Sequence, residues 1–141
     1  MEQSNTLLEA VKAWVEEYPE LGELDLHIDQ VDDDAPSYSV GTSGLILLSE
    51  SVLGIQTWQY NAVLQSREYT ADDLSRLNAA AFTEQFIFWT NDRNASDDLP
   101  DLPSGMIPES ISADNGMLLD LDEDGDRGVY QIQIHLVFTK E

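Results

Sequence analysis

Apolar residues recur along the chain with two spacings, one typical of helices and one typical of strands. In residues 82–91, Phe82, Phe86 and Trp89 lie three or four positions apart and therefore fall on one helical face. In residues 130–138, apolar and polar residues alternate, which is typical of a strand buried on one face. Because half-buried strands favour antiparallel pairing, we expect the aromatic helix to pack on a mostly antiparallel sheet.

Two further helices are predicted from caps and apolar spacing. The first follows a cap at Ser4 or Asn5, ends near Pro19, and has apolar residues at helical spacing (Leu7, Leu8, Val11, Trp14 and Val15). The second begins at Thr70, whose hydroxyl can cap it, and runs to about Ala80. It directly precedes the aromatic helix, so a central pair of helices is expected.

The remaining apolar segments predict strands. The longest, residues 55–67, is expected to be central, with its largest residues on one face (Trp58, Tyr60, Ala62 and Leu64). Asn115-Gly116 is a turn signal between two short strands, and the prolines of residues 99–105 exclude further helix there. The shorter predicted strands are residues 24–29, 38–41, 45–48, 109–113 and 117–119.

The order of these elements predicts the fold class. A chain of 141 residues suits one domain, residues 1–141, with a single core. We expect an α+β fold in which a single mostly antiparallel β-sheet carries an N-terminal helix and the central helical pair. Trp14, Trp58 and Trp89 all fall on apolar faces and are expected to pack in the core rather than to stack on a ligand.

The composition is strongly acidic. The chain has 28 acidic and 6 basic residues and a formal charge of −22, which should repel phosphate backbones, so direct DNA or RNA binding is not expected. Hydrophobic residues still make up 42% of the chain, so the acids belong to the surface of a folded protein. Charge alone leaves four explanations open: solubility, a surface that DNA passes without sticking, salt adaptation, and mimicry of DNA.

The sequence lacks the residues and motifs that several kinds of catalysis and metal binding require. The absence of cysteine excludes disulfides, thiolate catalysis and cysteine-ligated metals. No glycine-rich phosphate loop or nucleophile elbow occurs, so we expect no enzyme, no catalytic residues and no cofactor. No apolar run has the length of a membrane span and no signal-peptide pattern is visible, so synthesis in the cytoplasm and no membrane contact are expected.

One segment is a weak calcium candidate. Residues 120–125 match the first half of a calcium loop, with Asp120, Asp122 and Asp124 as the candidate ligands. The twelfth position is Gln131 instead of a bidentate glutamate, and it falls in a predicted strand where an EF-hand needs a helix. An acidic hairpin connection that attracts cations weakly is the alternative.

The two histidines are a second weak candidate. His27 and His135 both lie on the polar sides of their predicted strands, so they could face each other across the sheet as metal ligands or acid–base groups. Since no metal-binding spacing accompanies them, solvated strand residues are the alternative.

Five segments, taken in order, carry a resemblance to a known family. They are Ser66-Arg67-Glu68-Tyr69, the aromatic set of residues 82–89, Leu99-Pro100-Asp101-Leu102-Pro103-Ser104-Gly105, Leu119-Asp120-Leu121-Asp122-Glu123-Asp124, and Tyr130-Gln131-Ile132-Gln133. Over most of its length the chain resembles the tail terminator, or minor tail-completion (minor capsid), proteins of long-tailed bacteriophages and prophages.

The resemblance implies a structural role without turnover. A protein of this family forms a hexameric ring on the head-proximal end of the tail tube, stops tube polymerisation and provides the head-tail joining surface. Expected partners are further copies of the chain in a homohexamer, the tail tube protein and a head-completion or connector protein. The protein would be made in the host bacterial cytoplasm and assembled into the virion tail or neck. Ring contacts are expected from the sheet edge or from a flexible loop around residues 42–54.

Three other functions remain open. A neck or connector protein next to the terminator would share the size and general architecture. An acidic DNA mimic or inhibitor would bind a basic nucleic-acid enzyme. A calcium-responsive module would use Asp120, Asp122 and Asp124.

Overall fold

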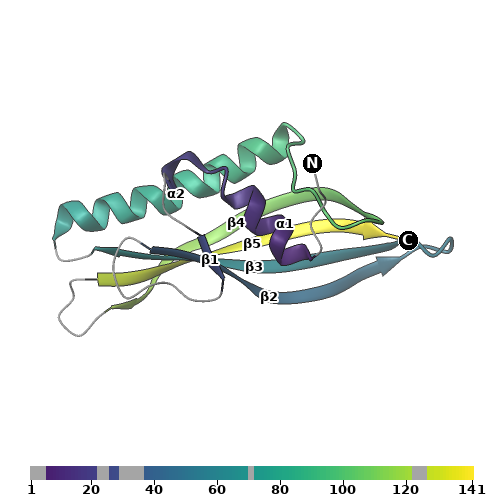
Figure 1. Cartoon of the computed structure of the whole chain (residues 1–141), viewed down its shortest axis with the longest axis horizontal. Coiled ribbons are helices and arrows are strands. Elements are labelled where there is room, and N and C mark those ends of the chain that lie inside the picture. Colours follow the sequence, from purple (N-terminus) through teal and green to yellow (C-terminus); the bar gives the residue numbers. More distant parts are fainter. Residues whose placement is uncertain (1–5, 22–25, 29–36, 70–71, 122–126) are drawn as a thin grey trace.

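The fold is a long sheet with a layer of helices on one face (Figure 1). The structure is a computed structural model that describes residues 6–21, 26–28, 37–69, 72–121 and 127–141. Its elements, in chain order, are α1 (Leu7–Val15), the short 3-10 helix η1 (Pro19–Leu21), β1 (Leu26–Ile28), β2 (Ser37–Glu50), β3 (Gln56–Tyr69), α2 (Asp73–Ala95), β4 (Met106–Leu121) and β5 (Arg127–Lys140).

The five strands form one sheet in the order β1-β2-β3-β5-β4. β1 pairs with β2 in parallel, and the other three pairs are antiparallel. The central pair β3 and β5 is in register along its whole length, for example with Tyr60 opposite Leu136 and Leu64 opposite Ile132. The predicted α+β class with a mostly antiparallel sheet is therefore confirmed.

The core lies between the helices and one face of the sheet. Alternate residues of β5 are buried there (Tyr130, Ile132, Ile134, Leu136 and Phe138), as the period-two pattern predicted. The buried residues of β3 include Tyr60, Ala62 and Leu64, three of the four predicted for one face. Trp14 is buried, and Trp58 and Trp89 pack against the core from partly buried positions, so the prediction for the tryptophans is confirmed.

An aromatic cluster joins the two helices to each other and to the sheet. The Tyr18 ring lies 5.4 Å from the Phe82 ring and 5.1 Å from that of Phe86, and its hydroxyl donates to the carbonyl of Phe82 at 3.2 Å. The Arg93 guanidinium lies 4.8 Å from the rings of both Trp14 and Trp89. Edge-to-face ring contacts and cation–π contacts of this kind stabilise the packing beyond the area that the rings bury.

The predicted pair of central helices is wrong, because α2 is one continuous helix of 23 residues. Residues 79–81 are three alanines, which have the highest helix propensity and carry the helix through the predicted break. The Thr83 hydroxyl donates back to the Ala80 carbonyl at 2.8 Å, so it does not cap a new helix.

Both predicted helix caps are displaced. Thr6, rather than Ser4 or Asn5, caps α1, because its hydroxyl accepts from the Glu9 amide at 3.1 Å. Asp72 caps α2 by accepting from the Ser75 amide at 2.7 Å. An aspartate at this position also places negative charge at the positive end of the helix dipole.

Two pairs of predicted short strands are each one long strand. β2 contains residues 38–41 and 45–48 and absorbs the residues between them in a register shift at Thr42/Gly44. β4 runs through Asn115-Gly116 with a register shift at Asp114/Met117, so the predicted turn is wrong. A β-bulge accommodates extra residues without ending the strand. Because the bulge interrupts the alternation of apolar and polar residues, the sequence pattern predicts a loop at that point.

Phe86 and Phe88 provide a matched test of the core, since they are two residues apart on α2. Phe86 is fully buried and Phe88 is 64% exposed. We expect Phe86→Ala to lower the free energy of unfolding by about 3–5 kcal/mol, because it leaves a cavity in the aromatic cluster. Phe88→Ala should change it by less than about 0.5 kcal/mol. Urea denaturation followed by tryptophan fluorescence measures both, and equal losses would contradict this packing.

Candidate functional site

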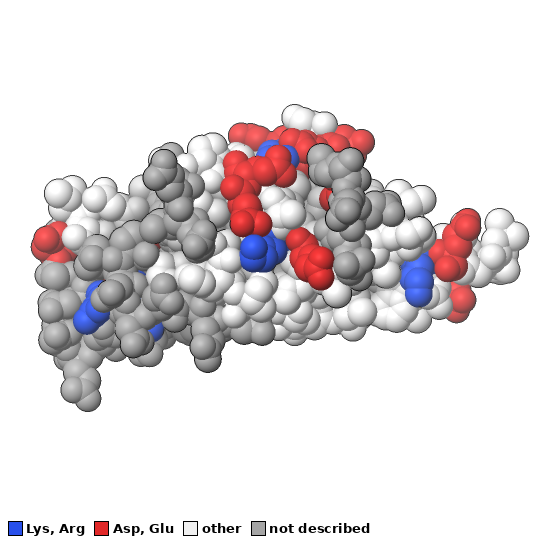
Figure 2. All heavy atoms as spheres, in the orientation of Figure 1, with Lys and Arg blue, Asp and Glu red and all other residues white. Residues whose placement is uncertain are grey.

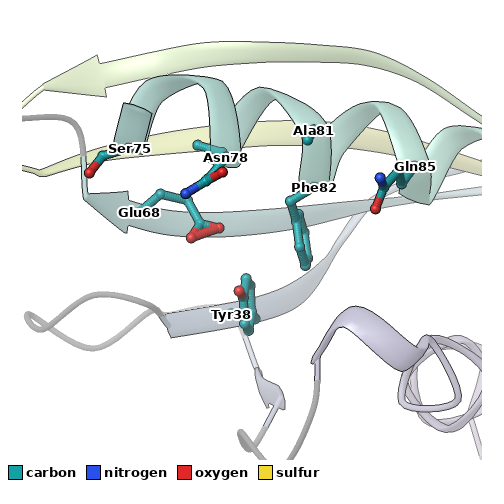
Figure 3. A pocket seen from close by; sticks show the side chains of 8 residues that line it. Tyr38, Glu68, Ser75, Asn78, Ala81, Phe82 and Gln85 are labelled. Carbon is teal, nitrogen blue, oxygen red and sulfur yellow. The ribbon is translucent and has the colours of Figure 1, made fainter. Parts of the chain in front are cut away.

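A polar hollow of about 410 Å³ lies between α2 and the strands β2 and β3. Figure 3 shows Glu68 of β3 in it, with its carboxylate directed to the space between Asn78 and Tyr38. Ser66 donates a hydrogen bond of 2.5 Å to this carboxylate, and the Tyr38 side chain also bonds to it. Burial raises the pKa of Glu68, while these two hydrogen bonds lower it.

This hollow does not contain a catalytic constellation. Its described lining residues include no histidine and no second carboxyl group that could complete an acid–base pair with Glu68. The rings of Tyr38 and Phe82 stack 4.8 Å apart at its wall and close the core behind it. Glu68 is therefore a half-buried carboxyl held by its neighbours, and the expectation that the chain is not an enzyme stays a prediction.

The histidines do not face each other. His27 lies on β1 and His135 on β5, and β2 and β3 stand between these strands, so the predicted pairing is wrong. On the uncovered face of the sheet, His135 Nδ1 lies 2.7 Å from Asn61 Oδ1 and Nε2 lies 3.2 Å from Asp114 Oδ2. Within the described part of the chain, no group of three histidine, aspartate or glutamate residues is placed to hold a metal ion.

The calcium candidate falls largely outside the described residues. Asp122 and Asp124 are not among them. Asp120 pairs through its backbone register with Val129 on β5, as part of the β4–β5 ladder. Calcium binding by this segment stays a prediction.

The most prominent exposed feature is the end of the β2–β3 hairpin. Leu45 lies opposite Tyr60 and Leu47 opposite Trp58, so both leucines are on the face that elsewhere forms the core. They are nevertheless 51% and 44% exposed. The nine residues of α1 extend about 13 Å and the 23 residues of α2 about 34 Å, whereas a strand of 14 residues extends about 45 Å. Figure 1 shows the hairpin continuing past both helices at this end.

The turn of this hairpin presents two apolar side chains to solvent. Val52 is fully exposed and Leu53 is 83% exposed. The Ser51 hydroxyl accepts from the amides of Leu53 at 3.3 Å and Ile55 at 3.2 Å, and the Ser51 carbonyl accepts from the Gly54 amide at 3.0 Å. Gly54 has φ +85°, which glycine adopts without strain. The turn is therefore held in one shape by its own hydrogen bonds.

The outer edge of β2 is also open beside this turn. β1 pairs only with residues 38–40 of β2, so in the described structure the edge from Gly41 to Glu50 has no neighbouring strand. Unpaired backbone donors and acceptors on a long edge strand readily pair with another chain unless charges or prolines protect them. Residues 41–49 contain neither.

Charge is almost absent from the hairpin. Residues 37–66 contain one charged residue, Glu50, and the rest of the chain carries the other 27 acidic residues and all 6 basic ones. Figure 2 shows acidic atoms gathered over the helices, whereas the outermost atoms at the right-hand end, the hairpin tip, are uncharged and have acidic and basic atoms beside them. We call the exposed apolar residues of this end the hairpin surface: Leu45, Ile46, Leu47, Leu48, Val52, Leu53 and Ile55. Groups of exposed apolar residues such as this one mark sites of protein interaction.

A flexible loop over residues 42–54 is one of the two predicted ring contacts, beside the sheet edge. In the structure these residues form parts of β2 and the tight turn that leads to β3, so the predicted loop is wrong. The ring contact expected from these residues stays a prediction. The sequence signal for an exposed apolar surface is residues 45–48, which are apolar on both faces of the strand although the helices cover at most one face.

Comparison with protein-family models finds no match, and comparison with curated proteins finds no significant similarity. No helix in the described ranges is both long and apolar enough to cross a membrane.

Glu68 gives a prediction for pH dependence. Because its pKa is raised above its ordinary value of 4.5, the folded protein keeps this proton to a higher pH than the unfolded chain does. Ionisation of Glu68 therefore lowers the free energy of unfolding as the pH rises from 4.5, the ordinary pKa, through the raised pKa of the folded protein. Glu68→Gln removes this loss, so its stability relative to wild type should increase from acidic to neutral pH.

The measurement is urea denaturation of both proteins across this pH range. Glu84→Gln is the matched control, because Glu84 is exposed on α2. A difference between Glu68→Gln and wild type that does not change with pH would contradict the raised pKa.

Proposed function

We propose that this protein is a structural component of a phage or prophage virion that caps the head-proximal end of the tail tube. In that role it stops tube polymerisation and provides the head-tail joining surface. It acts by contact, as a ring of identical copies, and its partners are the tail tube protein and a head-completion or connector protein.

The observation that carries this proposal is the hairpin surface. It is rigid, apolar and almost uncharged, on a chain whose formal charge is −22. An exposed apolar element on a soluble, highly charged chain indicates that burial against another protein is part of its function. The order of the sequence segments supplies the particular class, and the α+β architecture is compatible with it.

The uncovered face of the sheet fits the same proposal. Its described side chains include uncharged amides and hydroxyls such as Gln59, Asn61, Gln133 and Thr139. Two basic residues of this face, Arg67 and Arg127, lie at the end of the sheet away from the hairpin tip. The rest of the described face has no cluster of lysine and arginine to hold a phosphate backbone, so DNA can pass that part without binding. A protein at the head-tail junction needs this property, because DNA travels through the channel.

The acidic inhibitor is the second candidate, and the charge of −22 favours it. A DNA mimic would meet a basic enzyme through its acidic surfaces, which lie over the helices (Figure 2). The hairpin surface would then have no role. The terminator role uses both features, with the hairpin as the contact and the acids as the source of repulsion toward DNA.

The test is tube capping. Tail tube protein from the phage or prophage that encodes this chain is polymerised with and without the purified protein, and tube lengths and ends are measured by electron microscopy. We expect shorter tubes with a ring at one end. Unchanged lengths and bare ends would contradict the proposal, and selective binding to a basic nucleic-acid enzyme would favour the inhibitor.

A matched pair of variants links capping to the hairpin surface. Leu53→Ser should lower the apparent affinity for the tube end by about tenfold or more, since burying a leucine contributes about 1.5–3 kcal/mol. Ile107→Ser, which alters a residue 65% exposed on β4 and outside the hairpin, should leave capping unchanged. Equal effects of the two variants would show that the hairpin surface is not the contact.

A further inference from the structure

A second apolar feature lies on α2, away from the hairpin. α2 and η1 enclose a hollow of about 290 Å³ lined by Tyr18, Pro19, Gln85, Phe88, Trp89 and Asp92, which we call the α2 groove. Phe88 is 64% exposed at this groove. Leu74 and Leu77, also exposed, continue the same side of the helix toward its N-terminus. An exposed aromatic ring beside a hollow is a usual anchor point at protein interfaces.

The hairpin tip has the properties of a ligand for such a groove. Val52 and Leu53 project from a turn that three hydrogen bonds to Ser51 hold in place. Because the turn is already ordered, docking it loses little conformational freedom. Two apolar side chains on a narrow projection match a small apolar hollow better than they match a flat surface.

The tip and the groove of one copy do not meet. Figure 1 shows the hairpin extending past the end of the helix layer, with its turn at the far right and α2 above the sheet. Val52 is fully exposed, so the tip has no contact within its own chain that covers it. A contact between tip and groove therefore requires a second molecule.

The distribution of charge favours a second copy of this chain. α2 contains three acidic residues and two basic ones (Asp73, Glu84, Asp92, Arg76 and Arg93), a net charge of −1. Residues 37–66 also carry −1, so these 53 residues together carry −2 of the total −22. The α2 groove lies in the acidic helix layer (Figure 2), with Asp92 in its lining and Glu17 paired with Arg93 of α2. The nearly uncharged hairpin tip is therefore the part of a second copy that can approach this layer with little repulsion, whereas an acidic part would be repelled.

We propose that Val52 and Leu53 of one copy dock into the α2 groove of the next copy. This inference rests on the proposed function, since it assigns the contact that builds the ring. The contact is heterologous, because donor and acceptor are different surfaces of the same chain, and a heterologous contact continues from copy to copy until a ring closes. Phe88 and Trp89 would cover the two aliphatic side chains, with Pro19 as the opposite wall.

The absence of cysteine from the chain allows a direct test by cross-linking. Leu53→Cys and Phe88→Cys are made separately, mixed at high protein concentration in high salt to screen repulsion, and treated with a short bifunctional thiol reagent. Ile107→Cys is the control acceptor, because Ile107 has the same exposure as Phe88 but lies on β4. All three substitutions alter exposed side chains, so the proteins are expected to fold.

We expect the 53–88 product to exceed the 53–107 product by about tenfold or more, because docked thiols meet at an effective concentration on the order of 1 mM. Equal yields of the two products would overturn the proposal. A dominant 53–53 product would also overturn it and would indicate symmetric pairing of hairpins along the open edge of β2.

A second measurement uses complementation and does not depend on thiol geometry. Leu53→Asp removes the donor and Phe88→Asp removes the acceptor, so neither variant alone should associate. Their mixture should form a 1:1 dimer through the one intact tip and groove, detected by sedimentation. No dimer in the mixture, together with association of wild type, would overturn the inference while leaving tube capping to decide the proposed function separately.

Discussion

The main constraint on this structure is that the helix layer is shorter than the sheet on which it packs (Figure 1). Burial of one sheet face by α1 and α2 forms the core, and the aromatic cluster around Tyr18, Phe86 and Trp89 fixes the position of these helices. The strands β2 and β3 continue beyond the helices, so Leu45 and Leu47 occupy positions that are buried elsewhere in the sheet. The same alternation that builds the core therefore leaves apolar side chains exposed at the end of the hairpin. Only contact with another protein can remove them from water.

Charge decides where such a protein could approach. A chain with a formal charge of −22 repels its own copies, and this repulsion acts over about 10 Å at ordinary ionic strength. The hairpin is nearly neutral, so it is the part of the chain that can approach another copy at small electrostatic cost. Under the proposed function, the same charge that confines this approach to the hairpin also keeps DNA from binding to the completed ring.

The sequence predicts the elements with strong periodicity and fails where local signals compete with the sheet. β5 and the aromatic face of α2 follow from spacing alone. Asn115-Gly116 is a strong turn signal, but β4 continues through it in its pairing with β5. α2 continues through residues 79–81 because the three alanines there favour helix. The hairpin surface could be located from residues 45–48, whereas the α2 groove could not, because it depends on how η1 lies against α2.

The mass of the wild-type protein in solution tests the central claim, that this chain functions by associating with its own copies. Light scattering after size exclusion, over a range of protein concentrations and in low and high salt, gives this mass, and negative-stain microscopy shows the shape. The account predicts a closed ring that becomes more populated as salt screens the repulsion. A monomer at every concentration and every salt would contradict it.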